Sequence, residues 1–299
     1  MRPTARLARP ARLAAGGLVA VALLGVSACN GDNADARAQT GASVSAPSTP
    51  ATSEAPAVSS SPPSPTPKTK APKTVKVSHL SAKTLVPALQ KALATHKSAH
   101  MRMQISSKGL SMTADGHASY GPHPAMRMTM HVPQLGTGDI ELRFMGDTAY
   151  IAIPPMTPPG KFVKFDASDP NNPLGPDLGQ IRGQLSPSRT FDGFEAGLKS
   201  VDFIGVESVD GEPMGHYLLT LDSAKALKAT TGQKQPPGTP KTVSYDLWVD
   251  RHNLMRRLQM NISGTGIDIS ADDWGKPVHV QAPPAKDVVS LSSLSGTKG

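Results

Sequence analysis

The chain has 299 residues, a single cysteine, 4% aromatic residues and a formal net charge of +8. The first 28 residues hold four arginines and no acidic residue, so the rest of the chain carries only +4. A surplus of this size, without a basic stripe interleaved with aromatic residues, argues against a nucleic-acid-binding protein. One cysteine excludes an intramolecular disulfide, so the fold must depend on its hydrophobic core.

The N-terminus has the pattern of a secretory signal. Four arginines precede the apolar run "LAAGGLVAVALLGVSA", residues 13–28. This run is shorter than the about 20 residues that a membrane-spanning helix needs. A basic start, an apolar segment and small residues before a cleavage site are typical of a signal peptide. We therefore assign residues 1–28 to a signal peptide.

The lone cysteine directly follows this segment. Val26, Ser27 and Ala28 before Cys29 resemble the lipobox of bacterial lipoproteins, with Val26 in the place where leucine is usual. Cleavage after Ala28 would leave Cys29 as an N-terminus that carries a diacylglycerol and an acyl chain such as palmitate. Two or three such chains anchor a protein firmly. The sequence predicts a lipoprotein on the extracytoplasmic face of the cell membrane. The alternative is a plain signal peptide or a short anchor helix with an incidental cysteine.

Residues 30–76 lack the apolar side chains of a folded domain. They are mostly Ala, Ser, Thr, Pro, Gly and Asp, and no aromatic residue occurs before Tyr120. Such a composition cannot bury enough apolar area to offset the entropy of ordering, and its prolines favour extended conformations. We assign residues 29–76 to the acylated N-terminus and a disordered tether, 77–288 to one folded domain, and 289–299 to a flexible tail.

The folded domain begins as a helix and continues as strands. Leucines recur every four residues within 80–99, where Ser81 is the expected N-cap. Alternating apolar residues then predict strands, separated by turns at Gly146-Asp147, Asp210-Gly211 and 250–253. The expected strands lie at 100–106, 125–132, 139–144, 148–154, 162–167, 201–209, 216–221, 243–250 and 254–262.

Two further helices interrupt the strands. We expect one from about Pro187 to Leu198, and one that starts at Asp222 as N-cap and ends before Gly232. The order is a helix, a long meander, a helical insert and a returning meander. This order predicts an α+β fold, with a large curved antiparallel β-sheet (a half-barrel) and helices packed on its concave face.

Methionine is frequent on the predicted strands, with twelve in the chain against twelve aromatic residues. Its unbranched side chain adapts to irregular apolar shapes, so a methionine-rich sheet face could line a cavity for acyl chains. Ordinary core residues beneath the helices are the other interpretation. Met255 and Met260 lie on opposite phases, so only one is expected to join this face. The candidate cavity residues, assigned to adjacent strands, are Met101, Met103, Ile105, Met126, Met128, Met130, Ile140, Leu142 and Phe144.

Catalytic motifs are missing from the sequence. Gly-x-Ser-x-Gly, a Walker-type phosphate loop and His-Glu-x-x-His do not occur. His96 and His100 are four residues apart, but the helix should end between them, and no carboxylate or cysteine completes a metal site. Two possible carboxylate pairs, Asp272 with Asp273 and Asp202 with Glu207, are expected on solvated turns or outer strand faces. We expect no enzyme, no cofactor and no metal site.

Several strands and turns resemble a known family. The segments "MGDTAYIAIP", "KFVKFDASDPNNPLGPDLGQI", "VDFIGVESVDGEPMGHYLLTLDSAKAL" and "VSYDLWVDRHNLMRRLQMNI" resemble, in order and character, those of actinobacterial LppX/LprG-type lipoproteins, which are similar in fold to the periplasmic carrier LolA. The resemblance covers about residues 80–285 and the lipobox. Phe162 stands where the family would have tryptophan. The resemblance implies a LolA-like fold with a cavity between sheet and helices that holds the acyl chains of a lipid or glycolipid.

These observations together predict a membrane-anchored, monomeric protein of the cell envelope. Its domain is expected to bind acyl chains in an apolar cavity, as a carrier or chaperone of a lipid or glycolipid. The alternative is a non-transporting sensor or scaffold of the same fold with a collapsed cavity. Neither hypothesis includes a nucleic-acid partner.

Overall fold

The computed structural model describes residues 77–136, 138–169, 175–186 and 189–295. The predicted signal peptide, its cleavage site at Val26–Ala28, the acylated Cys29 and the tether lie outside the described residues. Within the described part, no helix is long and apolar enough to cross a membrane.

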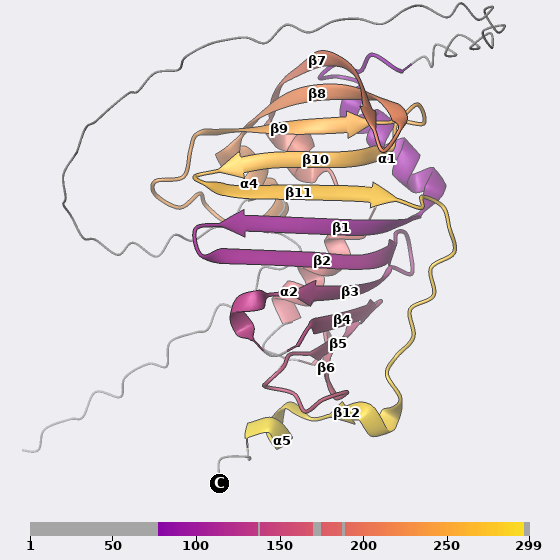
Figure 1. Cartoon of the computed structure of the whole chain (residues 1–299), viewed down its shortest axis with the longest axis vertical. Coiled ribbons are helices and arrows are strands. Elements are labelled where there is room, and N and C mark those ends of the chain that lie inside the picture. The colour runs from indigo at the N-terminus through magenta and orange to yellow at the C-terminus, as the bar shows by residue number, and fades with distance from the viewer. Residues whose placement is uncertain (1–76, 137, 170–174, 187–188, 296–299) are drawn as a thin grey trace, which may run out of the picture. The chain divides into compact units, whose positions relative to one another are not determined.

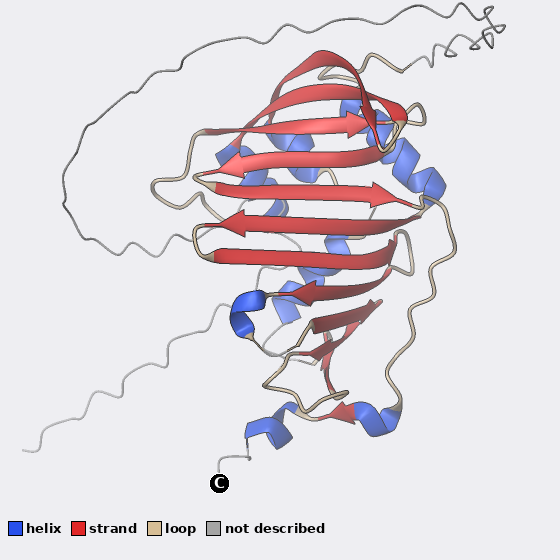
Figure 2. Ribbon diagram, in the orientation of Figure 1, coloured by secondary structure: helices blue, strands red, loops and turns tan. Residues whose placement is uncertain are grey.

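Twelve strands of the described chain form one sheet (Figures 1 and 2). Their order is β12-β6-β5-β4-β3-β2-β1-β11-β10-β9-β8-β7, and every pair is antiparallel except β12 with β6. The strands are β1 (Ser98–Ser107), β2 (Leu110–Ser119), β3 (Ala125–His131), β4 (Ile140–Met145), β5 (Thr148–Ala152), β6 (Phe162–Asp166), β7 (Leu198–Val209), β8 (Glu212–Asp222), β9 (Thr242–Val249), β10 (Met255–Ile262), β11 (Thr265–Asp272) and β12 (Val288–Val289).

The longer helices lie behind the sheet in the view of Figure 1. Buried side chains of these helices, such as Leu89, Leu178 and Phe194, join one core cluster with the apolar face of the strands. The predicted fold class is therefore confirmed as one large antiparallel sheet with helices on one face. The helices are α1 (Leu85–His96), α2 (Gly175–Gln184), α3 (Asp192–Gly197), α4 (Ser223–Thr231) and α5 (Leu291–Ser295), with short 3₁₀ turns η2 (Pro133–Leu135) and η3 (Ala285–Asp287).

Two of the predicted helices differ from their expected bounds. The first begins at Leu85, with Thr84 instead of Ser81 at the N-cap position, and the Ser81 hydroxyl lies 3.1 Å from the Thr84 hydroxyl. The helix expected over 187–198 corresponds to the short helix α3. Another helix, α2, precedes it in a segment whose glycine and proline residues had predicted a loop. The α4 helix is confirmed, since the Asp222 carboxylate accepts the Lys225 N–H at 3.0 Å.

Three strands were missed, namely β2, β11 and the short β12, and the first two change the arrangement of the sheet. The β11 strand pairs with β1 and joins the two meanders, and β2 lies between β1 and β3. The sequence had suggested that the methionine strands β1 and β3 are neighbours. They are not, because β2 separates them. The alternation of β2 is carried by Ala114, Gly116 and Ala118, whose small side chains give a weak apolar signal.

Two smaller expectations also need correction. A β-bulge between Met255 and Arg257 changes the phase of β10, so both Met255 and Met260 contact the core cluster. The segment assigned to a flexible tail starts with ordered elements, since Val289 belongs to β12 and 291–295 form α5.

Gly116 provides a test of the β2–β3 pairing. A Cβ atom at this position would lie 2.1 Å from the Arg127 carbonyl oxygen and 2.8 Å from the Met128 Cα. Because both atoms belong to backbone, Gly116→Ala should lower the free energy of unfolding by about 1–3 kcal/mol, as measured by urea denaturation.

Gly179 in α2 is the matched control, because a Cβ there meets no atom within 4 Å. Gly179→Ala should leave stability unchanged or raise it by up to about 1 kcal/mol. Equal effects of the two substitutions would contradict the close approach of β2 and β3.

Candidate functional site

The nine candidate cavity residues share one face of the sheet. Six are buried side chains of the core cluster, while Met101, Met103 and Ile140 are only partly buried against it. The face is built in cross-strand rows in which small residues of β2 separate the methionines. The rows are Ala99–Ala118–Met126–Phe144, Met101–Gly116–Met128–Leu142 and Met103–Ala114–Met130–Ile140.

Helices and loops cover this methionine face. The Tyr120 hydroxyl donates to the Met101 Sδ at 3.3 Å, and its ring stacks with Trp274 at a centroid distance of 6.5 Å. Burial raises the pKa of Tyr120, so the hydroxyl stays protonated as a donor. These contacts hold the Tyr120 side chain against Met101.

Helix α2 is attached to the loops of the sheet near its C-terminal end. Arg182 forms an ion pair with Asp147 in the β4–β5 turn, at 2.6 Å. The Leu185 carbonyl, just after the helix, accepts the Gly121 N–H of the β2–β3 loop at 3.3 Å. Each of these two polar contacts involves a single loop residue. The buried side chains of Leu178 and Leu185 supply the apolar part of the attachment of α2 to the sheet.

Six of the nine candidate cavity residues are buried within the core cluster. Four pockets of about 240 to 640 Å³ are formed by described residues, and Met103 alone of the nine candidates borders any of them. Apart from Met103, Ala114 and Val209, the pocket that Met103 borders is lined by polar residues of the opposite face. The methionine face is therefore part of the core here, and an acyl cavity stays a prediction.

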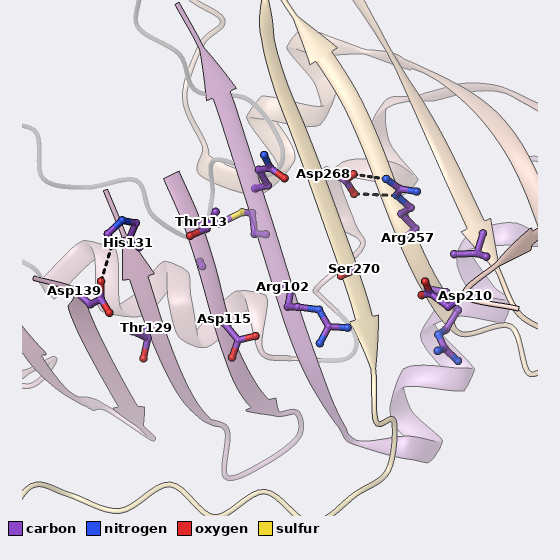
Figure 3. A pocket seen from close by; sticks show the side chains of 15 residues that line it. Arg102, Thr113, Asp115, Thr129, His131, Asp139, Asp210, Arg257, Asp268 and Ser270 are labelled. Atoms are coloured by element: carbon purple, nitrogen blue, oxygen red, sulfur yellow. Dashed lines mark hydrogen bonds and ion pairs between the residues drawn. The ribbon is translucent and has the colours of Figure 1, made fainter. Parts of the chain in front are cut away.

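The opposite face of the sheet carries a groove of about 640 Å³, which we call the polar groove (Figure 3). The side chains of Arg102, Asp115 and Ser270 line its floor, on β1, β2 and β11. Asp210, in the β7–β8 turn, borders one part of the groove, and the His131–Asp139 pair, 2.8 Å apart, borders another.

His100 joins two carboxylates beside this groove. Its Nε2 lies 2.9 Å from Asp115 Oδ2, and its Nδ1 lies 2.9 Å from Asp272 Oδ1. Arg102 also pairs with Asp272. The cluster ties β2, β1 and β11 together.

His216 forms a second cluster of the same kind. Its two ring nitrogens lie 2.8 Å from Glu207 on β7 and 2.8 Å from Asp246 on β9. The ring stacks on Trp248 at 4.4 Å, and the Trp248 Nε1–H donates to Glu207 at 2.8 Å. These two hydrogen bonds, first that of Trp248 and then that of His216, hold the pKa of Glu207 below its usual value.

Two further carboxylates of the polar face are stabilised in their ionised form. Burial alone would raise the pKa values of Asp268 and Asp272. Hydrogen bonds from Arg257 and Gln259 to Asp268, and from His100 and Arg102 to Asp272, together lower both pKa values. The bidentate pair of Arg257 and Asp268, at 2.6 and 3.1 Å, is visible in Figure 3.

The sequence analysis did not find these clusters. Asp272 and Glu207 were expected on solvated surfaces, whereas each is bound to a histidine and to a second donor. His100 and Asp272 are far apart in the chain, and only the β1–β11 register, which was missed, pairs them. His96 and His100 form no metal site with other residues, and the described residues contain no group of three or more ligands for a metal.

Comparison with known proteins gives only structural likenesses. Neither a protein-family model nor a curated protein matches the chain. LprF from Mycobacterium bovis is similar at 16% identity and a TM-score of 0.49, over 68% of this chain and 97% of that one. Lipoprotein LppX from Mycobacterium tuberculosis is similar at 17% identity and a TM-score of 0.47, over 67% and 98%. Likenesses at this level concern the fold alone, and they include the lipoproteins that the sequence resembles.

The Glu207–Trp248 contact predicts a pH effect. Trp248→Phe removes the donor, so the pKa of Glu207 should rise toward its usual value, which NMR titration of its carboxyl group measures. Because the pKa of Glu207 is lower in the folded state than its usual value of about 4.5, its ionised carboxyl group adds stability above that pH. This contribution is lost as the pH falls below about 4.5 and through the folded-state pKa. The difference in unfolding free energy between the unaltered chain and Trp248→Phe should therefore shrink below that pH.

Trp274→Phe is the matched control. The Trp274 Nε1 is buried and has no hydrogen-bond partner among the described residues. Its removal should leave the pKa of Glu207 and the pH dependence of stability unchanged. If both variants shift the titration of Glu207 equally, the Trp248 contact does not set its pKa.

Proposed function

We propose that the domain binds the acyl chains of a lipid or glycolipid between the methionine face and the helices, as a carrier or chaperone. The observation that carries this proposal is the incomplete cover of the methionine face. Met101, Met103 and Ile140 keep part of their surface exposed on a face whose other candidate residues are buried.

The composition of the face suits a flexible apolar ligand. Each methionine of β3 lies opposite Ala114, Gly116 or Ala118 of β2. Long unbranched side chains next to small ones can change rotamer without a clash with branched neighbours. Such a face can admit an alkyl chain by repacking, with little loss of apolar contact.

Helix α2 is the element whose displacement would open the face. Its ion pair, Arg182 with Asp147, joins side chains that are 60% and 55% exposed. An exposed pair of this kind contributes about 0–1 kcal/mol, so the polar contacts alone do not hold the helix in place. An acyl chain that replaced Leu178 and Leu185 over the methionine rows would compensate for their lost burial.

The N-terminal segment supplies the location in this proposal. Acylation of Cys29 and a tether of 47 residues would hold the domain close to the extracytoplasmic face of the membrane, where acyl lipids are found. One observation favours the alternative of a non-transporting sensor or scaffold. Six of the nine candidate residues are buried, and of the four pockets described above only the polar groove contacts the rows of the methionine face, at Met103 and Ala114.

Substitution of Met103 tests the acyl site. Met103→Gln keeps the length of a half-buried side chain but adds an amide that an alkyl chain cannot satisfy. The affinity for a fluorescent fatty-acid probe should fall roughly tenfold, measured by fluorescence titration of the purified domain. Extraction of the unaltered protein followed by mass spectrometry should also recover a bound acyl lipid.

Met156→Gln is the matched control, because Met156 is 65% exposed in the loop after β5. It should leave probe affinity unchanged, and thermal unfolding should show both variants folded. The absence of co-purified lipid together with no saturable binding of the probe would overturn the carrier proposal in favour of the alternative.

Membrane anchoring is tested separately. Cys29→Ala removes the acyl acceptor, so the protein should no longer incorporate labelled palmitate or partition into detergent in a bacterial host. Ser27→Ala keeps a small residue before the cysteine and should preserve both properties. Membrane retention of Cys29→Ala without label would indicate an uncleaved anchor helix instead.

A further inference from the structure

We propose that the polar groove binds an extended, uncharged oligosaccharide that lies across the strands. The polar floor of this site is on the face opposite the proposed acyl site, and the two sites share Met103 and Ala114 at one border of the groove. Its floor consists of two parallel cross-strand rows that run over β3, β2, β1, β11 and β10. The rows are Thr129–Asp115–Arg102–Ser270–Arg257 and His131–Thr113–Gln104–Asp268–Gln259.

The groove contains side chains with unused hydrogen-bonding capacity. Among the described residues, the hydroxyl and amide groups of Gln104, Thr113, Thr129 and Ser270 have no hydrogen-bond partner. Each of these side chains lines the groove. A row of unpaired hydroxyl and amide groups can both donate to and accept from the hydroxyl groups of a sugar.

The charges of the groove offset one another. Three arginines face four aspartates, and the strongest pair, Arg257 with Asp268, is already bidentate. A polyanion would meet the carboxylates of Asp115 and Asp210, and a polycation would meet the arginines. A neutral ligand meets neither penalty, while the fixed charged groups remain strong hydrogen-bond partners for hydroxyls.

The size of the groove suits a chain of several sugar rings. It adjoins a second pocket of about 570 Å³ that shares Gln104 and Asp268 with it. Strands lie about 4.8 Å apart, so the floor from β3 to β10 is about 19 Å long. The advance per pyranose ring in an extended glycan is close to this strand spacing, so successive rings can meet equivalent positions on successive strands.

A peptide fits the groove less well. The strands of the floor are hydrogen-bonded to neighbours on both sides, so no open edge is available for strand addition. Twelve of the fifteen lining residues are polar, and only Met103, Ala114 and Val209 are apolar, so the groove offers few apolar contacts for peptide side chains. The observations therefore favour a polyhydroxylated ligand.

The test is a calorimetric titration of the purified chain with cellohexaose, maltohexaose and a mannohexaose. At least one of these should bind saturably, and heparin and hexalysine should not bind more tightly. The double variant Gln104→Ala/Thr129→Ala should weaken binding roughly tenfold, because two hydrogen-bonding side chains are lost.

The matched control is Gln281→Ala/Thr148→Ala, which removes the same two residue types outside the lining of the groove. It should change the affinity by less than about twofold. The proposal is overturned if no neutral hexasaccharide binds, if heparin or an extended peptide binds more tightly than the sugars, or if the control weakens binding as much as the groove variant. Loss of lipid binding alone would leave it intact.

Discussion

The antiparallel pairing of β1 with β11 is the contact on which the rest of the structure depends. It joins a meander of residues 98–166 to a returning meander of residues 198–272 in one continuous sheet. The register places Met103 opposite Ile269 on one face and Arg102 opposite Ser270 on the other. Because side chains alternate in a strand, a slip of one residue would bring charges into the core and methionines to the surface. Both candidate binding faces are therefore consequences of this register.

Much of the fold could be predicted because most strands carry a strong alternation. The methionines of β1 and β3 fix which residues face the helices, whatever the order of the strands. Strand β2 was missed because small residues such as Ala114 and Gly116 weaken its alternation. Strand β11 was missed although Ile267 and Ile269 alternate with less buried residues, and without these two strands the neighbours of β1 could not be assigned. The clusters of His100 and His216 could not be predicted, since their carboxylates come from strands whose pairing was unknown.

The two faces of the sheet are held together by different interactions. Ion pairs and bidentate hydrogen bonds link neighbouring strands on the polar face, where they are partly shielded from water. Among the described residues, no ion pair links the rows of the methionine face, and helices with buried apolar side chains cover it. One face of the sheet is linked by ion pairs, and the other is covered by helices that can repack. This arrangement suits the uptake of a flexible apolar chain, because the sheet itself stays intact.

The most direct test of the acyl site is an NMR titration with methionine methyl groups labelled by ¹³C. The methyl signals of Met101 and Met103 should shift on addition of a long-chain acyl lipid, because both side chains keep exposed surface beneath the helices. The signal of Met156, exposed in a loop, should stay in place. Shifts confined to Met156, or no shift of any methionine at saturating lipid, would contradict an acyl site on this face.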